Sequence, residues 1–125
     1  MGKSSKKKLA CAGDATKLPS PPGLPDPIDV LHEALTLVDE DREPGFAGVV
    51  NHDLAEAYRE VGRIDEAVSA FEKAVRLKRQ AGRTRDTAVT LRALASIYVD
   101  NGGFEAAITA LDEASELIRS EEPSR

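Results

Sequence analysis

The sequence has very few of the residues on which many kinds of site and scaffold depend. Its 125 residues include one cysteine, two histidines and no tryptophan, and only 4% of them are aromatic. The single cysteine, Cys11, cannot form an intramolecular disulfide, so we expect a fold that needs no oxidising compartment and a cytoplasmic location. With so few aromatic residues, small aliphatic side chains, mainly alanine, must fill the core.

Motifs for catalysis and for cofactor binding are also missing. The chain has no glycine-rich phosphate loop, no dinucleotide fingerprint, no nucleophile elbow and no pair of cysteines. His32 and His52 are too far apart for a two-histidine metal motif on one helix, and we expect both to be ordinary surface residues. The sequence therefore predicts no enzymatic activity, no cofactor and no metal site.

Long apolar runs are absent as well. No stretch approaches the 18 or so apolar residues that a membrane-spanning helix requires. After Lys6 to Lys8, the apolar stretch from Leu9 to Ala12 ends at Gly13, which is too short for the core of a signal peptide. These absences exclude a membrane span and a secretory signal from the interpretation.

Charge and proline divide the chain into a tail and a body. The net charge is −5, but residues 1–26 carry +3 from five lysines and two aspartates, which leaves −8 on residues 27–125. We expect residues 1–26 to be a disordered, basic, proline-rich tail, residues 27–120 to fold, and residues 121–125 to be disordered. An acidic body repels phosphate backbones, so we expect no nucleic-acid binding by the folded part.

The first helix has clear start and stop signals. Asp26 is suited to cap the helix, and Pro27 fits its first turn because proline has no N–H to leave unpaired. Apolar residues then follow at helical spacing: Ile28, Leu31, Leu35 and Val38. Because a residue before proline disfavours helical angles, we expect this helix to end near Glu40, ahead of Pro44.

The remainder of the chain matches itself when it is shifted by 40 residues. Six positions are identical and one keeps its apolar class. The first copy consists of Leu54, Ala55, Tyr58, Gly62, Ala67, Phe71 and Ala74, and the second of Leu94, Ala95, Tyr98, Gly102, Ala107, Leu111 and Ala114. Each copy predicts a helical hairpin, with helices at about 46–61 and 65–80, then 86–100 and 104–120.

Glycines mark the predicted turns of these hairpins. Gly62, Gly82 and Gly102 can adopt left-handed backbone angles where each helix ends. Residues 31–34 of the first helix also align with residues 71–74 and 111–114, so the first helix is a lone copy of the second helix of a hairpin. The sequence therefore predicts an all-α fold, a short right-handed α-solenoid of about five antiparallel helices.

The pattern Leu-Ala-x-x-Tyr, then Gly, then Ala-x-x-x-Phe-x-x-Ala resembles the tetratricopeptide repeat (TPR) family. The 40-residue spacing, longer than the usual ~34, is similar to the longer-helix subclass found in kinesin light chains and bacterial regulatory proteins. The resemblance implies a scaffold that binds an unidentified protein or peptide in a groove lined by the first helix of each hairpin. It places the following residues there: His52, Asp53, Glu56, Arg59, Glu60, Val89, Arg92, Ala93, Ser96, Val99 and Asp100.

Two other functions stay open at this stage. One is a homo-oligomeric structural module whose last helix packs on a neighbouring copy through Ile108, Leu111, Ala114 and Ile118. The other is an adaptor tethered to a membrane or polyanion through its N-terminus, by way of Gly2, Lys3, Lys6 to Lys8 and Cys11. A single basic cluster binds membranes weakly, so membrane contact is expected only if the N-terminus is lipidated.

Overall fold

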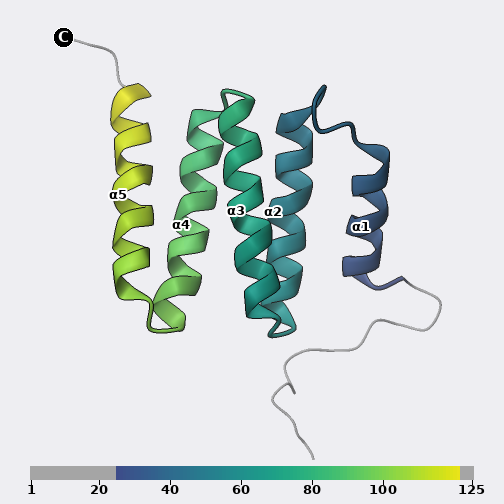
Figure 1. The fold of residues 1–125 in the computed structure, drawn as a ribbon, viewed down its shortest axis with the longest axis horizontal. Helices are drawn as coiled ribbons and strands as arrows, with labels where there is room; N and C mark the ends of the chain where they lie inside the picture. The colour runs from purple at the N-terminus through teal and green to yellow at the C-terminus, as the bar shows by residue number, and fades with distance from the viewer. Residues whose placement is uncertain (1–24, 122–125) are drawn as a thin grey trace, which may run out of the picture.

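Five helices lie side by side in chain order and alternate in direction (Figure 1). The structure, a computed structural model, describes residues 25–121. The helices are α1 (Pro27–Leu37), α2 (Pro44–Glu60), α3 (Ile64–Gln80), α4 (Thr84–Asp100) and α5 (Phe104–Glu121). The predicted all-α helical array is confirmed. The anchor residues proposed for the N-terminus, from Gly2 to Cys11, lie outside the described residues.

The three tight turns share one geometry. Gly62, Gly82 and Gly102 have φ angles of 83°, 75° and 81°, a region that residues with a Cβ rarely adopt. After each glycine, a backbone N–H returns to a carbonyl of the preceding helix: Arg63 to Tyr58 at 2.9 Å, Arg83 to Lys78 at 2.9 Å, and Gly103 to Tyr98 at 2.7 Å. This six-residue closure satisfies helix-end carbonyls and fixes the hairpin angle.

The first helix begins where predicted but ends earlier. Asp26 Oδ1 accepts the N–H of Ile28 at 2.8 Å, which confirms the cap. The helix was expected to reach Glu40, yet Val38 is already extended, with φ −102° and ψ 132°. The physical reason lies in Asp39, whose carboxylate accepts the backbone N–H of Asp41 at 3.0 Å and so stabilises a turn in place of another helical turn.

The second helix begins two residues earlier than the expected Phe46. Pro44 is its first residue rather than the end of a loop. Proline has no N–H to pair, and its fixed φ suits the first helical turn. Pro44, which predicted the end of the first helix, is therefore also the start of the second.

One apolar cluster is shared by four consecutive helices, α1 to α4. Leu54, Ala55 and Tyr58 of α2 pack with Ala67, Ala70 and Phe71 of α3 and with Leu94 and Ile97 of α4. Ala55, Ala67 and Phe71, three of the repeat-signature residues, are fully buried. Side chains from α1, namely Ile28, Leu31 and Leu35, cover the cluster on one side.

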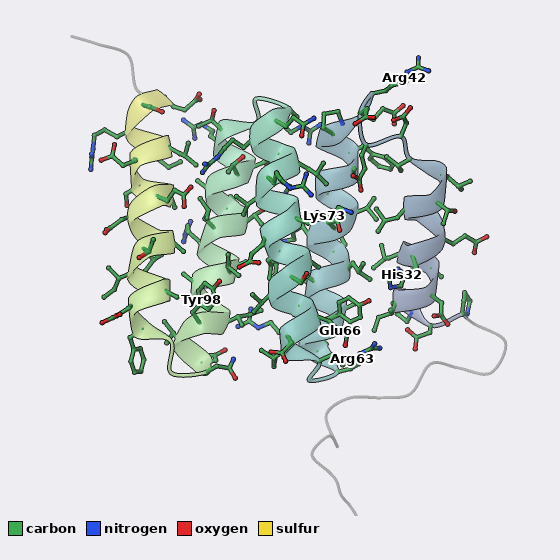
Figure 2. All side chains as sticks on the ribbon, viewed as in Figure 1. His32, Arg42, Arg63, Glu66, Lys73 and Tyr98 are labelled. Atoms are coloured by element: carbon green, nitrogen blue, oxygen red, sulfur yellow. The ribbon has the colours of Figure 1, made fainter. Side chains whose placement is uncertain are left out.

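The 40-residue repeat extends to polar contacts. The hydroxyl of Tyr58 lies 2.7 Å from His32 Nε2 on α1, and the hydroxyl of Tyr98 donates to Glu72 Oε2 on α3 at 3.1 Å. Both tyrosines and both of their partners are 40 residues apart in sequence, and His32 and Tyr98 can be found in Figure 2. Hence α4 covers α3 in the same way that α2 covers α1.

The buried part of the contact between α4 and α5 is built mainly from alanine. Ala107, Ala110 and Ala114 of α5 pack on Ala88, Leu91 and Ala95 of α4, with Val75, Tyr98 and Leu117 at the margin. All three α5 alanines are buried. Ala114, which the homo-oligomer hypothesis assigned to a neighbouring copy, therefore faces α4 of its own chain.

Candidate partner-binding face

The exposed sides of α2 and α4 form one continuous surface, which we call the α2–α4 face. On α2 it is made of Asp53, Glu56, Arg59 and Glu60, and on α4 of Val89, Ser96 and Asp100. Ala93, which was also predicted to line it, is half-buried among residues of the first apolar cluster.

The side chain of Arg59 on α2 forms hydrogen bonds with α4 across this face. Arg59 Nη2 donates to Ser96 Oγ at 2.9 Å and to Asp100 Oδ2 at 3.0 Å. Both acceptors are on α4, one helical turn apart. Because a guanidinium can donate to two acceptors at once in a fixed geometry, these bonds hold α2 and α4 in register along the face.

Negative charge dominates the α2–α4 face. It carries four carboxylates, on Asp53, Glu56, Glu60 and Asp100, against the one guanidinium of Arg59. Arg59 is paired with Asp100, and Glu56 Oε2 lies 3.6 Å from His52 Nε2, so the carboxylates of α2 add to a negative local potential. The α2–α4 face is therefore acidic.

Three predicted groove residues are placed elsewhere. Arg92 lines a surface cavity against α5, and Val99, about half exposed near the end of α4, is joined by no hydrogen bond or ion pair to the other residues of the face. His52 lies beneath the face, with only 18% of its side chain exposed.

The prediction that His52 is an ordinary surface residue was wrong. Its Nδ1 lies 3.0 Å from the hydroxyl of Thr90, and its ring packs edge-on against Phe71. Thr90 is fully buried. Its hydroxyl also accepts a hydrogen bond from the ammonium of Lys78 at 2.9 Å and donates one to the backbone carbonyl of Asp86 at 3.1 Å. His32 is exposed but is bound to Tyr58, so it too has a structural partner.

This network of His52, Lys78 and Thr90 joins α2, α3 and α4. Burial lowers the pKa of His52 below its ordinary value of 6.5, and the nearby charge of Lys78 lowers it further, against the opposing effect of Glu56, Asp53 and Asp86. Burial likewise lowers the pKa of Lys78. Sequence reasoning missed Lys78, although a signal existed: the repeat aligns it with the apolar Ile118, and a lysine at an apolar position indicates a buried cation.

The lowered pKa of His52 predicts a loss of stability in mild acid. Between pH 6.5 and the lower folded-state pKa of His52, the unfolded chain binds more protons than the folded chain. The free energy of unfolding therefore decreases as the pH is lowered through this window, and it becomes constant again below the folded-state pKa. Urea denaturation as a function of pH measures this effect. His52→Gln should remove the dependence and His32→Gln should retain it, while Lys78→Met should raise the pKa of His52 in an NMR titration. An unchanged profile in His52→Gln contradicts the assignment.

Within residues 25–121, no three His, Cys, Asp or Glu side chains come close enough together to hold a metal ion. In the same part of the chain, no helix is both long and apolar enough to cross a membrane.

The fold and its surface define the class of the protein: an array of antiparallel helical hairpins, related by a 40-residue repeat, with an exposed face shared by the first helices of the hairpins. Residues 46–120 match the tetratricopeptide repeat family, and the chain belongs to that family. Members of this family are generally modules for protein–protein interaction, and no enzyme family matched. Comparison with curated proteins and with solved structures gave no match.

Proposed function

We propose that this chain is an adaptor that binds a peptide or helix of a partner protein through the α2–α4 face. The observation that carries the proposal is the Arg59 bridge, which fixes the exposed sides of α2 and α4 into one surface. A surface that is already ordered loses little conformational entropy when it binds a ligand. Membership of a family of interaction modules supports the same function.

The partner segment that fits this face is basic. Asp53, Glu56 and Glu60 are spaced three and four residues apart on α2, so their carboxylates follow one side of the helix. A segment with lysine or arginine at matching intervals would meet all three, while Val89 on α4 gives it an apolar contact. Complementary charge of this kind sets specificity and association rate.

Selection from a random peptide library displayed on phage tests the proposal. We expect the selected peptides to be rich in lysine and arginine. Synthetic copies of them should bind Glu56→Lys at least about tenfold more weakly than the wild-type chain. The matched control is Asp65→Lys, an exposed aspartate on α3 outside the face, which should bind normally. Selection of uncharged peptides, or an equal loss in Asp65→Lys, would overturn the proposal.

A further inference from the structure

The repeat identifies a side of α5 that lacks a covering helix among the described residues. On α3, α4 contacts the side formed by Ile64, Val68, Phe71, Val75 and Lys78. The residues 40 positions later are Phe104, Ile108, Leu111, Ser115 and Ile118, and we call this side the α5 open face.

The apolar residues of this face are exposed where their counterparts are covered. Phe71 is fully buried, but Leu111, its counterpart, is 43% exposed, and Phe104 and Ile108 are 61% and 58% exposed. Four large apolar side chains on one helix form a contiguous patch, and patches of this kind mark interaction sites more often than isolated apolar residues do.

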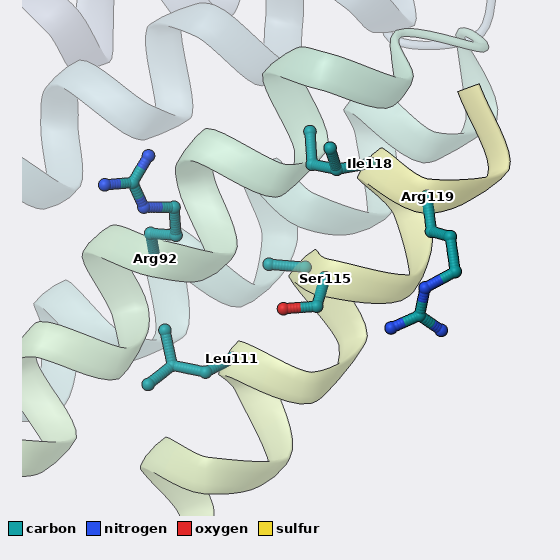
Figure 3. Close-up of a pocket in the computed structure, with 6 residues that line it drawn as sticks. Arg92, Leu111, Ser115, Ile118 and Arg119 are labelled. Atoms are coloured by element: carbon teal, nitrogen blue, oxygen red, sulfur yellow. The ribbon is translucent and has the colours of Figure 1, made fainter. Parts of the chain in front are cut away.

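The spacing of the α5 open face suits contact with a single straight helix. Its residues follow one another at intervals of four, three, four and three. This is the spacing with which two helices pack along a common seam. In Figure 3, Leu111, Ser115 and Ile118 lie along α5 opposite Arg92 of α4, and together with Ala114 and Arg119 they line a cavity of about 430 Å³.

The face complements itself when a second copy approaches in the opposite direction. Phe104 is seven residues before Leu111 and Ile118 seven after it, so a two-fold axis at Leu111 sets Phe104 of each copy against Ile118 of the other. Glu105 and Arg119, the latter also paired with Glu116 of its own helix at 2.7 Å, lie on one flank, seven residues to either side of Asp112. The same axis brings the opposite charges of Glu105 and Arg119 together twice. The same axis places Asp112 opposite Asp112 of the second copy, and this pair of like charges is unfavourable.

We propose that the occupant of the α5 open face is a second copy of this chain, bound antiparallel in a closed two-fold dimer. The seam buries Phe104, Ile108, Leu111 and Ile118 of both copies and fills the cavity beside Arg92. This interface is separate from the carboxylates of the α2–α4 face, so the dimer and the adaptor function can be tested independently.

Light scattering on the intact chain over a concentration series measures the dimer directly. We expect a mass of twice 13.4 kDa that falls on dilution. Ile108→Glu should raise the dissociation constant by about tenfold or more. Circular dichroism should show an unchanged helix content, because Ile108 is largely exposed. The matched control is Leu37→Glu, an 83% exposed leucine at the other end of the array, which should leave the dimer intact.

Charge variants test the antiparallel arrangement itself. Arg119→Glu alone should weaken the dimer, the double variant Glu105→Arg with Arg119→Glu should restore it, and Asp112→Asn should strengthen it. A monomer at every concentration up to about 1 mM overturns the proposal. So does a dimer that resists Ile108→Glu, one that Leu37→Glu dissociates, or a double variant that is weaker than Arg119→Glu alone.

Discussion

Replacing Phe71 with alanine should lower the free energy of unfolding by about 3–5 kcal/mol. Phe71 is fully buried at the junction of α2, α3 and α4, and its ring supports His52. Its large neighbours Leu54, Leu94 and Ile97 are themselves buried and packed in the same cluster, so we expect them to fill only part of the cavity. Since small domains have about 5–15 kcal/mol of total stability, this change should come close to unfolding the protein.

Urea denaturation followed by circular dichroism measures the effect of this substitution. Phe46→Ala is the matched control, because Phe46 is about half exposed at the start of α2 and should cost less than about 1 kcal/mol. If the two substitutions have equal effects, Phe71 is not the centre of the core that the structure describes.

Replacing Ala55 with leucine should lower the free energy of unfolding by about 2–3 kcal/mol through overpacking. Ala55 is fully buried in the cluster that α2 and α3 share, opposite the equally buried Ala67. A larger side chain here forces the two helices of the first hairpin apart and disturbs the Arg59 bridge to α4. Partner binding through the α2–α4 face should weaken together with stability.

The control for this change is Ala106→Leu on α5. Ala106 is exposed and lines a surface cavity, so the added atoms have space and stability should change by less than about 0.5 kcal/mol. An Ala55→Leu variant as stable as the wild type would show that the cluster shared by α2 and α3 has space for a larger side chain at this position.

The repeat made most of the fold predictable from sequence. Identical residues 40 positions apart are expected to occupy equivalent environments, which predicted the helical hairpins, the glycine turns at Gly62 and Gly102 and the buried alanines. The end of α1 could not be predicted in the same way, because it depends on the Asp39 side chain, which competes locally with the helix for backbone N–H groups.

The candidate site was predictable only in part. Periodicity and the family resemblance placed Glu56, Arg59 and Ser96 on the exposed sides of α2 and α4, but pairing between helices decides which of them touch. Thr90 on α4 contacts His52 on α2 and accepts a hydrogen bond from Lys78 on α3, and no local sequence pattern predicts such contacts between helices. Leu111 shows the opposite limit: it aligns with Phe71, yet it is exposed because no described helix packs over α5.

The most direct test of the adaptor function is NMR mapping of a bound peptide. Addition of a selected basic peptide to the isotopically labelled chain should shift the backbone amide signals of α2 and α4 around Asp53, Glu56 and Ser96, with little change along α3. Shifts confined to α3 or α5, or no shifts on α2 and α4 at saturating peptide, would contradict the claim that the α2–α4 face binds the partner.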